Sequence, residues 1–134
     1  MSRVPATVLL VDDDLQYLEL RAQVMKSCGF SVITAPGPME AISMLAKTNA
    51  IKVAVLDYQM PVMNGCLLAD RLKSMCPKLK IILHSGAVAI PESQMTNIDV
   101  SISKSDELAR LIASVSEHTT RIGQQSRLPS QARY

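Results

Sequence analysis

Acidic residues follow two apolar runs of the sequence, at positions where they could bind a metal ion together. Asp12, Asp13 and Asp14 come directly after the apolar residues 8–11, and Asp57 comes directly after a second apolar run. Carboxylates held close together repel one another and raise one another's pKa unless a cation lies among them. Oxygen ligands alone favour a hard divalent ion, most naturally Mg²⁺ that keeps some of its water. These acids therefore predict a magnesium site, provided that the fold brings them together.

A hydroxyl and an amine follow two further apolar runs. Ser85 comes shortly after residues 80–83, and Lys104 comes shortly after residues 100–102. A lysine beside a magnesium site would balance further negative charge, such as that of a phosphoryl group. Each residue alone has an ordinary structural interpretation: a lone Asp at a strand end is usually a turn residue, and one of the three consecutive acids, which we take to be Asp14, caps the helix that follows. The prediction therefore rests on the conjunction of carboxylates, hydroxyl and amine.

Two hydrophobic periodicities alternate along the chain and predict alternating strands and helices. Short aliphatic or β-branched runs predict strands at residues 8–11, 31–34, 53–56, 80–83 and 100–102. Apolar residues spaced at i+3 and i+4 predict helices around residues 15–25, 41–45, 68–75 and 108–115. Residues 88–97 are also predicted to form a helix, with Pro91 in its first turn, although apolar residues are sparse there.

This alternation predicts an α/β fold with a doubly wound, five-stranded parallel sheet, because strands joined through helices form parallel crossover units. Runs such as residues 53–56, which are apolar on both faces, are typical of a sheet covered by helices on both sides. In such a sheet, ligands bind beyond the carboxyl ends of the strands. The acids, Ser85 and Lys104 all follow predicted strands, so we expect them to meet at this edge.

Length and composition exclude several other classes of protein. The 134 residues suffice for one domain, and the four-residue apolar run 8–11 is far shorter than the roughly 20 residues of a transmembrane helix. We therefore expect no membrane insertion. The N-terminus shows no secretory h-region, and three cysteines without a CxxC pair are typical of reduced thiols. Both features predict a cytoplasmic protein.

The net charge of +2 hides an uneven distribution. Residues 119–134 carry three arginines and no acid, which leaves −1 for the rest of the chain. A nucleic-acid-binding domain would be expected to carry a basic stripe with stacking aromatic residues nearby. The chain has one Phe, three Tyr and no Trp. We therefore predict no direct nucleic-acid partner.

Two segments resemble the response-regulator receiver domain of two-component signalling. They are residues 8–14, VLLVDDD, and residues 55–65, VLDYQMPVMNG, and the resemblance covers residues 6–118. It implies a flavodoxin-like strand order, 2-1-3-4-5, with helices on both faces of the sheet. The receiver domain would span residues 1–121. Residues 122–134 are rich in Gln, Ser, Arg and Pro without a pattern, and we interpret them as a flexible C-terminal tail.

Transferred residue by residue, the resemblance implies a phosphorylation site that contains a metal ion. Asp57 would be the phosphoacceptor. Mg²⁺ would be held by Asp12, largely through water, by Asp13 more directly, by Asp57, and by the backbone carbonyl of Gln59. The product of a carboxylate nucleophile would be an aspartyl phosphate, which is readily hydrolysed.

The resemblance also implies roles for Ser85 and Lys104, which would hydrogen-bond to and pair with the phosphoryl oxygens. The chemistry would then be positioning and electrostatic stabilisation. The donor would be a phosphohistidine on a sensor histidine kinase or a histidine phosphotransfer protein, and the downstream protein partner is unknown. Neither a P-loop nor a kinase glycine loop is present, so direct use of ATP is not expected. The chain would thus be a signalling domain that catalyses its own phosphotransfer and dephosphorylation, and not a dedicated enzyme.

Two residues depart from the pattern of this family. Ser105 follows Lys104 where the family usually has Pro after a cis bond, and a cis bond before a non-proline residue costs about 3–4 kcal/mol. Ser101 stands where the family usually has an aromatic ring whose rotamer follows the switch hydroxyl. Signal output through the face formed by the fourth helical region and the fifth strand is therefore expected to be weak or to work differently. His84, next to Ser85, should point away from it into a layer between helix and sheet.

Two other functions fit parts of the sequence. A pseudo-receiver, an interaction module that works without phosphorylation, is favoured by Ser101 and Ser105 but opposed by the complete set of acids, Ser85 and Lys104. A flavin-binding protein would have the same fold, but three consecutive acids would repel the flavin phosphate. A receiver could in turn be a single-domain regulator, a phosphorelay intermediate or an excised domain of a longer protein.

Overall fold

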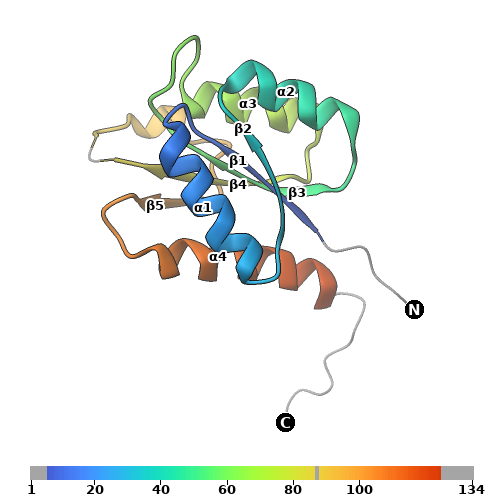
Figure 1. Cartoon of the computed structure of the whole chain (residues 1–134). Helices are drawn as coiled ribbons and strands as arrows, with labels where there is room; N and C mark the ends of the chain where they lie inside the picture. Colours follow the sequence, from blue (N-terminus) through green and yellow to red (C-terminus); the bar gives the residue numbers. More distant parts are fainter. Residues whose placement is uncertain (1–5, 87, 125–134) are drawn as a thin grey trace.

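The computed structural model describes residues 6–86 and 88–124 and contains one parallel sheet. Its five strands are arranged in the order β2-β1-β3-β4-β5. The predicted fold class and strand order are therefore confirmed (Figure 1). The strands are β1 (Thr7–Val11), β2 (Ser31–Ala35), β3 (Ile51–Leu56), β4 (Lys80–Ser85) and β5 (Val100–Ser103).

Helices cover both faces of the sheet, as Figure 1 shows. The helices are α1 (Leu15–Ser27), α2 (Pro38–Lys47), α3 (Gly65–Met75) and α4 (Leu108–Gln124). Helices α2 and α3 bury Leu45 and Leu72 in one apolar core, and α1 and α4 bury Met25 and Leu111 in another. Every residue of β1 is buried, which explains its continuous apolar run. No helix in residues 6–86 and 88–124 is both long enough and apolar enough to cross a bilayer.

Side-chain caps begin α1 and α3, the helices that follow β1 and β3. A side-chain oxygen of Asp14 accepts a hydrogen bond from the backbone N–H of Tyr17 at 3.2 Å, so its predicted role as the N-cap of α1 is confirmed. Asn64 caps α3 by accepting from the N–H of Leu67 at 2.9 Å. Each cap satisfies a backbone donor that would otherwise lack a partner, and each fixes the helix start next to the edge where the acids lie.

The predicted helix over residues 88–97 is wrong. This segment contains only a three-residue 3-10 helix, Glu92–Gln94, and it buries no residue. Too few apolar residues face the sheet here to stabilise a longer helix by packing. At the other end of the chain, α4 extends to Gln124. Residues 125–134 of the predicted tail lie outside the described residues.

Gly65, the first residue of α3, lies against the carbonyl of Asp57. A Cβ at Gly65 would lie 2.3 Å from the backbone oxygen of Asp57 and 3.0 Å from Cδ1 of Leu83. The N–H of Gly65 also donates to the carbonyl of Tyr58 at 2.8 Å. Only glycine therefore lets α3 approach the end of β3 this closely.

We expect Gly65→Ala to lower the free energy of unfolding by about 1–3 kcal/mol, because the new methyl group meets backbone atoms that cannot move aside. Gly86→Ala is the matched control, since a Cβ there meets nothing within 4 Å. Urea denaturation of both variants measures the difference. An equal loss of stability in the two variants would contradict this explanation of Gly65.

Candidate functional site

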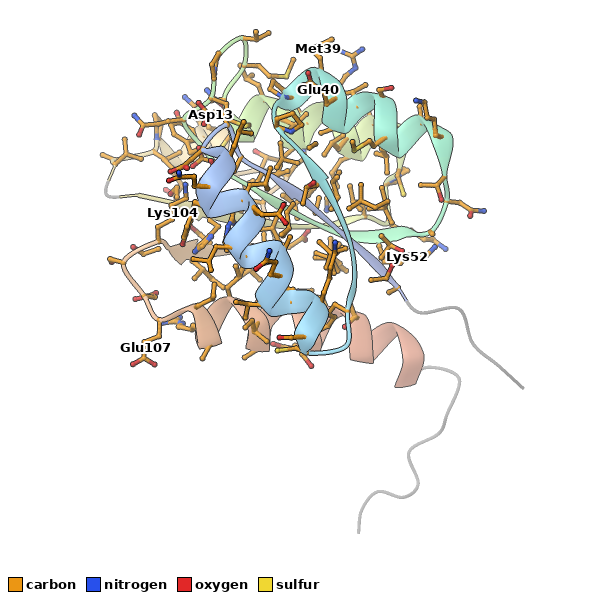
Figure 2. All side chains as sticks on the ribbon, viewed as in Figure 1. Asp13, Met39, Glu40, Lys52, Lys104 and Glu107 are labelled. Carbon is orange, nitrogen blue, oxygen red and sulfur yellow. The ribbon has the colours of Figure 1, made fainter. Side chains whose placement is uncertain are left out.

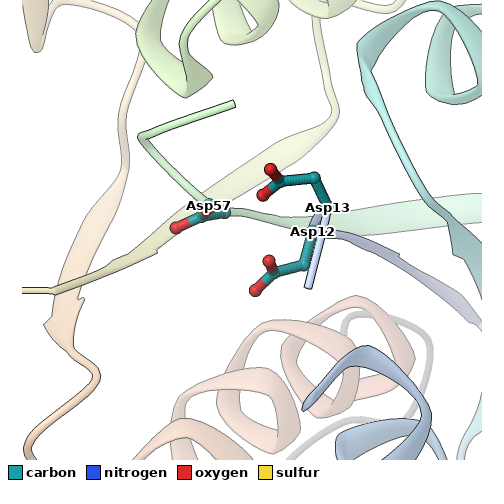
Figure 3. A group of neighbouring side chains, drawn as sticks. All are labelled: Asp12, Asp13 and Asp57. Carbon is teal, nitrogen blue, oxygen red and sulfur yellow. The ribbon is translucent and has the colours of Figure 1, made fainter. Parts of the chain in front are cut away.

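Three carboxylates lie together at the carboxyl edge of the sheet. Asp12 and Asp13 follow β1 and Asp57 follows β3, and one oxygen of each lies within 4.8 Å of the others (Figure 3). Asp12 and Asp57 are buried, whereas Asp13 is exposed. The fold thus brings together the acids that the sequence singled out. Asp14 is instead used as the cap of α1.

Lys104 joins two of these carboxylates. Its Nζ lies 2.9 Å from Oδ2 of Asp12 and 3.0 Å from Oδ1 of Asp57. Figure 2 shows Lys104 and Asp13 at the same end of the sheet, opposite Lys52. Burial by itself would lower the pKa of Lys104, but the hydrogen bonds to Asp12 and Asp57 outweigh it, so the pKa is raised. Lys104 therefore stays protonated and positively charged at neutral pH.

Lys104 reaches the carboxylates without the cis bond that is usual in the resembling family. No cis peptide bond occurs among residues 6–86 and 88–124, so Lys104 and Ser105 are joined in trans. The backbone N–H of Lys104 donates to the carbonyl of Ser85 at 2.7 Å. This backbone hydrogen bond fixes the start of the Lys104 side chain beside the end of β4.

The pKa of Asp57 is raised above its ordinary value. Burial is the largest cause, the charges of Asp12 and Asp13 add to it, and Lys104 opposes it. The three carboxylates therefore hold more negative charge than Lys104 alone can balance. A set of three carboxylate oxygens matches the ligands that Mg²⁺ prefers, so Asp12, Asp13 and Asp57 are suitable to hold that ion. Gln59 lies in the exposed loop after β3, and its carbonyl as a ligand stays a prediction.

Ser85 lies at the end of β4 and is buried, and its hydroxyl donates a long hydrogen bond, 3.4 Å, to the carbonyl of Gly86. Ser101 of β5 is exposed. Both serines line a recess of about 520 Å³, together with Val88 and Met95. The position that holds a ring in the resembling family thus leaves open space beside Ser85 in this chain.

Arg21 is a site residue that the sequence reasoning missed. Its side chain is fully buried, and its Nη2 lies 2.9 Å from Oδ2 of Asp12. Nη1 lies 3.0 Å from Nδ1 of His84, and the guanidinium carbon lies 4.6 Å from the ring centre of Tyr17. Arg21 follows Leu18 by three residues on the buried stripe of α1. A charged residue inside that apolar stripe was the signal that could have revealed it.

The sequence pattern of the response regulator receiver domain matches residues 8–116. The chain belongs to the response regulator receiver family. The transcriptional regulatory protein GlrR of Escherichia coli is 31% identical over 93 residues, which are 69% of this chain and 21% of GlrR. The autoinducer 1 sensor kinase/phosphatase LuxN of Vibrio campbellii is 32% identical over 91 residues, or 68% of this chain and 11% of LuxN. The receiver thus spans only a small part of these relatives.

Solved receiver structures have the same fold. A CheY-like receiver domain protein from Methanospirillum hungatei gives a TM-score of 0.83 at 22% identity, with 91% of this chain and 99% of that one covered. TrrA from Thermotoga maritima, solved in complex with Mg(2+)-BeF, gives a TM-score of 0.76 at 25% identity, with coverage of 84% and 97%. These structures agree with the strand order of the receiver described above.

His84 of this receiver lies, as expected, in the layer between the sheet and a helix, where its ring stacks with Tyr17 of α1 at 6.0 Å. The pKa of His84 is lowered to about 4, mainly by burial and also by the positive charges of Arg21 and Lys104, while Asp12 and Asp106 oppose this shift. The ring is therefore neutral at neutral pH. A guanidinium only donates hydrogen bonds, so Nδ1 of His84 accepts and the ring proton lies on Nε2.

The buried neutral ring makes stability depend on pH. The pKa of His84 is about 4 in the folded protein, against 6.5 for a histidine in an unfolded chain. Below pH 6.5 the unfolded chain binds a proton that the folded protein does not, so stability is lost as the pH falls from 6.5 towards 4. At pH 5 this loss is about 2 kcal/mol.

We expect His84→Gln to remove this loss, because the amide oxygen can still accept from Arg21 but does not titrate. Urea denaturation at pH 7.5 and pH 5 measures the difference for both proteins. The wild type should lose about 2 kcal/mol more than the variant over this range. Equal losses would show that His84 does not contribute to the acid sensitivity.

Proposed function

We propose that this receiver accepts a phosphoryl group on Asp57 from a phosphohistidine of a partner protein in a reaction that requires Mg²⁺, and that phosphorylation switches a protein-interaction surface. The observation that carries the proposal is the grouping of Asp57 with Asp12, Asp13 and Lys104. This group offers a nucleophile, oxygen ligands and a cation within one small space. These are the parts that phosphoryl transfer to a carboxylate needs.

The reaction replaces one bond to phosphorus by another. A carboxylate oxygen of Asp57 forms the new O–P bond, and the P–N bond of the donor breaks, with its electron pair returning to the imidazole. Negative charge spreads over three phosphoryl oxygens in the transition state. Lys104 already lies 3.0 Å from Asp57 and is placed to balance that charge. Bound Mg²⁺ would supply further charge neutralisation, held by Asp13, Asp57 and the carbonyl of Gln59, and by Asp12 largely through water.

The donor is inferred from the chemistry and from the relatives. The chain carries no P-loop, and LuxN, which shares this domain, is a sensor kinase/phosphatase. A histidine kinase or a histidine phosphotransfer protein is therefore the donor class that we propose. GlrR is a transcriptional regulatory protein, but the matched part covers only 21% of it, so its output is not transferred to this chain. We place the receiver in the cytoplasm, where such donors act.

Output is proposed to leave through residues 88–97. The Tyr58 hydroxyl donates a hydrogen bond to Oε1 of Gln94 at 3.0 Å, and thus joins the residue after Asp57 to the 3-10 helix. Nδ2 of Asn97 donates to Asp70 of α3 at 2.7 Å. The 3-10 helix of this segment buries no residue. The segment should therefore rearrange at a low cost in free energy. This route does not need a ring at position 101.

Phosphorylation of Asp57 is tested by intact mass after incubation with acetyl phosphate and Mg²⁺. The wild type should gain one phosphoryl group, and Asp57→Asn should gain none, because the amide is not a nucleophile. Omission of Mg²⁺ should remove the label from the wild type. Equal labelling of the two proteins would contradict the site. Absence of label in a folded wild type would favour the pseudo-receiver alternative.

The output route is tested by hydrogen exchange with and without beryllofluoride, a mimic of the aspartyl phosphate. We expect protection changes in residues 88–97 of the wild type. Tyr58→Phe removes the hydroxyl that contacts Gln94 while keeping the ring, and should reduce these changes at least about twofold, since a hydrogen bond of this kind contributes about 0.5–1.5 kcal/mol. Changes confined to residues 58–65 in the wild type would show that the signal does not pass through this segment.

A further inference from the structure

A buried cation that the proposed phosphoryl chemistry does not use lies directly behind the site. Arg21 and Asp12 form an ion pair at 2.9 Å, and both side chains are 0% exposed. Burial lowers the pKa of Arg21 and Asp12 opposes this, but arginine loses its proton only far above neutral pH. Arg21 therefore contributes a permanent positive charge that solvent does not screen.

Asp12 is held by three donors. Its Oδ2 accepts from Arg21 and from Lys104, and its Oδ1 accepts from the backbone N–H of Asp14 at 2.9 Å. These bonds come from α1, from the segment after β5 and from the start of α1. They fix the carboxylate in one orientation, and they leave it little capacity to bind a metal ion directly. This arrangement agrees with the expectation that Asp12 holds Mg²⁺ largely through bound water.

Arg21 also changes the charge of the whole site. Three carboxylates face two cations, Arg21 and Lys104, so the cluster carries one negative charge in excess instead of two. A divalent cation is attracted less strongly to the smaller negative charge, and the difference is large where the groups are shielded from water.

We propose that Arg21 is a positioning residue that fixes Asp12 and, as a resident cation, weakens the binding of Mg²⁺ at this site. This inference rests on the proposed magnesium site. If Arg21 only supported the structure, its removal would damage the site and weaken the binding of Mg²⁺. Removal of Arg21 should instead make binding of Mg²⁺ stronger.

The test is isothermal titration calorimetry of the full chain with MgCl₂. Arg21→Met replaces the guanidinium by an unbranched apolar side chain, and Asp12 keeps Lys104 and the N–H of Asp14 as partners. We expect its affinity for Mg²⁺ to rise about tenfold, the order expected for one unscreened charge. Arg21→Lys retains a cation and should stay within about twofold of the wild type.

Lys26→Met is the matched control, because it removes one positive charge from an exposed position on the same helix. Its affinity should not change, since an exposed charge away from the site is screened. Circular dichroism checks that each variant is folded. If Arg21→Met does not fold, the double variant Arg21→Met with His84→Leu replaces the buried polar pair by apolar side chains, which proteins often tolerate.

An unchanged or weaker affinity in the folded Arg21 variant would overturn the inference, and so would an equal rise in Lys26→Met. Binding by the Arg21 variant but not by the wild type would overturn the proposed magnesium site of the native protein and support the role of Arg21. Binding by neither protein would overturn both. Binding by the wild type with no gain in the variant would leave the proposed function and remove only this inference.

Discussion

The buried carboxylate of Asp12 is the group on which the rest of the site depends. A charge removed from water costs several kcal/mol unless partners surround it. Asp12 obtains its partners from Arg21 of α1, from Lys104 after β5 and from the backbone at the start of α1. One carboxylate therefore fixes the end of β1, the orientation of α1 and the direction of the lysine. The loss of any one partner would therefore disturb the end of β1, the orientation of α1 and the direction of Lys104.

Close backbone approach provides the second constraint. Gly65 lets α3 start against the carbonyl of Asp57, and the side chain of Asn64 accepts from the backbone N–H of Leu67 in the first turn of that helix. The loop between them and β3 contains Val62 at φ 80°, a left-handed conformation that is unfavourable for a β-branched residue. The backbone carbonyl of Asp57 lies against Gly65, and its carboxylate pairs with Lys104.

The sequence predicted the sheet because its central strands are apolar on both faces, and topology then placed Asp12, Asp57 and Lys104 at one edge. It did not predict the conformation of residues 88–97, whose sparse apolar residues fit a weak helix and an irregular segment equally well. Arg21 was missed for another reason. Its contacts with Asp12 and His84 depend on how α1 lies over the sheet, and residue spacing along the helix does not specify that orientation.

The two cations on Asp12 have different freedom, and this difference bears on the proposed reaction. Lys104 is shared between Asp12 and Asp57 and is partly exposed, whereas Arg21 is fully buried and contacts only the first of these carboxylates. A phosphoryl group on Asp57 would attract Lys104 away from Asp12. In a site with one cation, that movement would leave a buried carboxylate without a charged partner, at a cost of several kcal/mol. Arg21 would remove this cost, because its buried guanidinium would still pair with Asp12 while Lys104 followed the charge on Asp57.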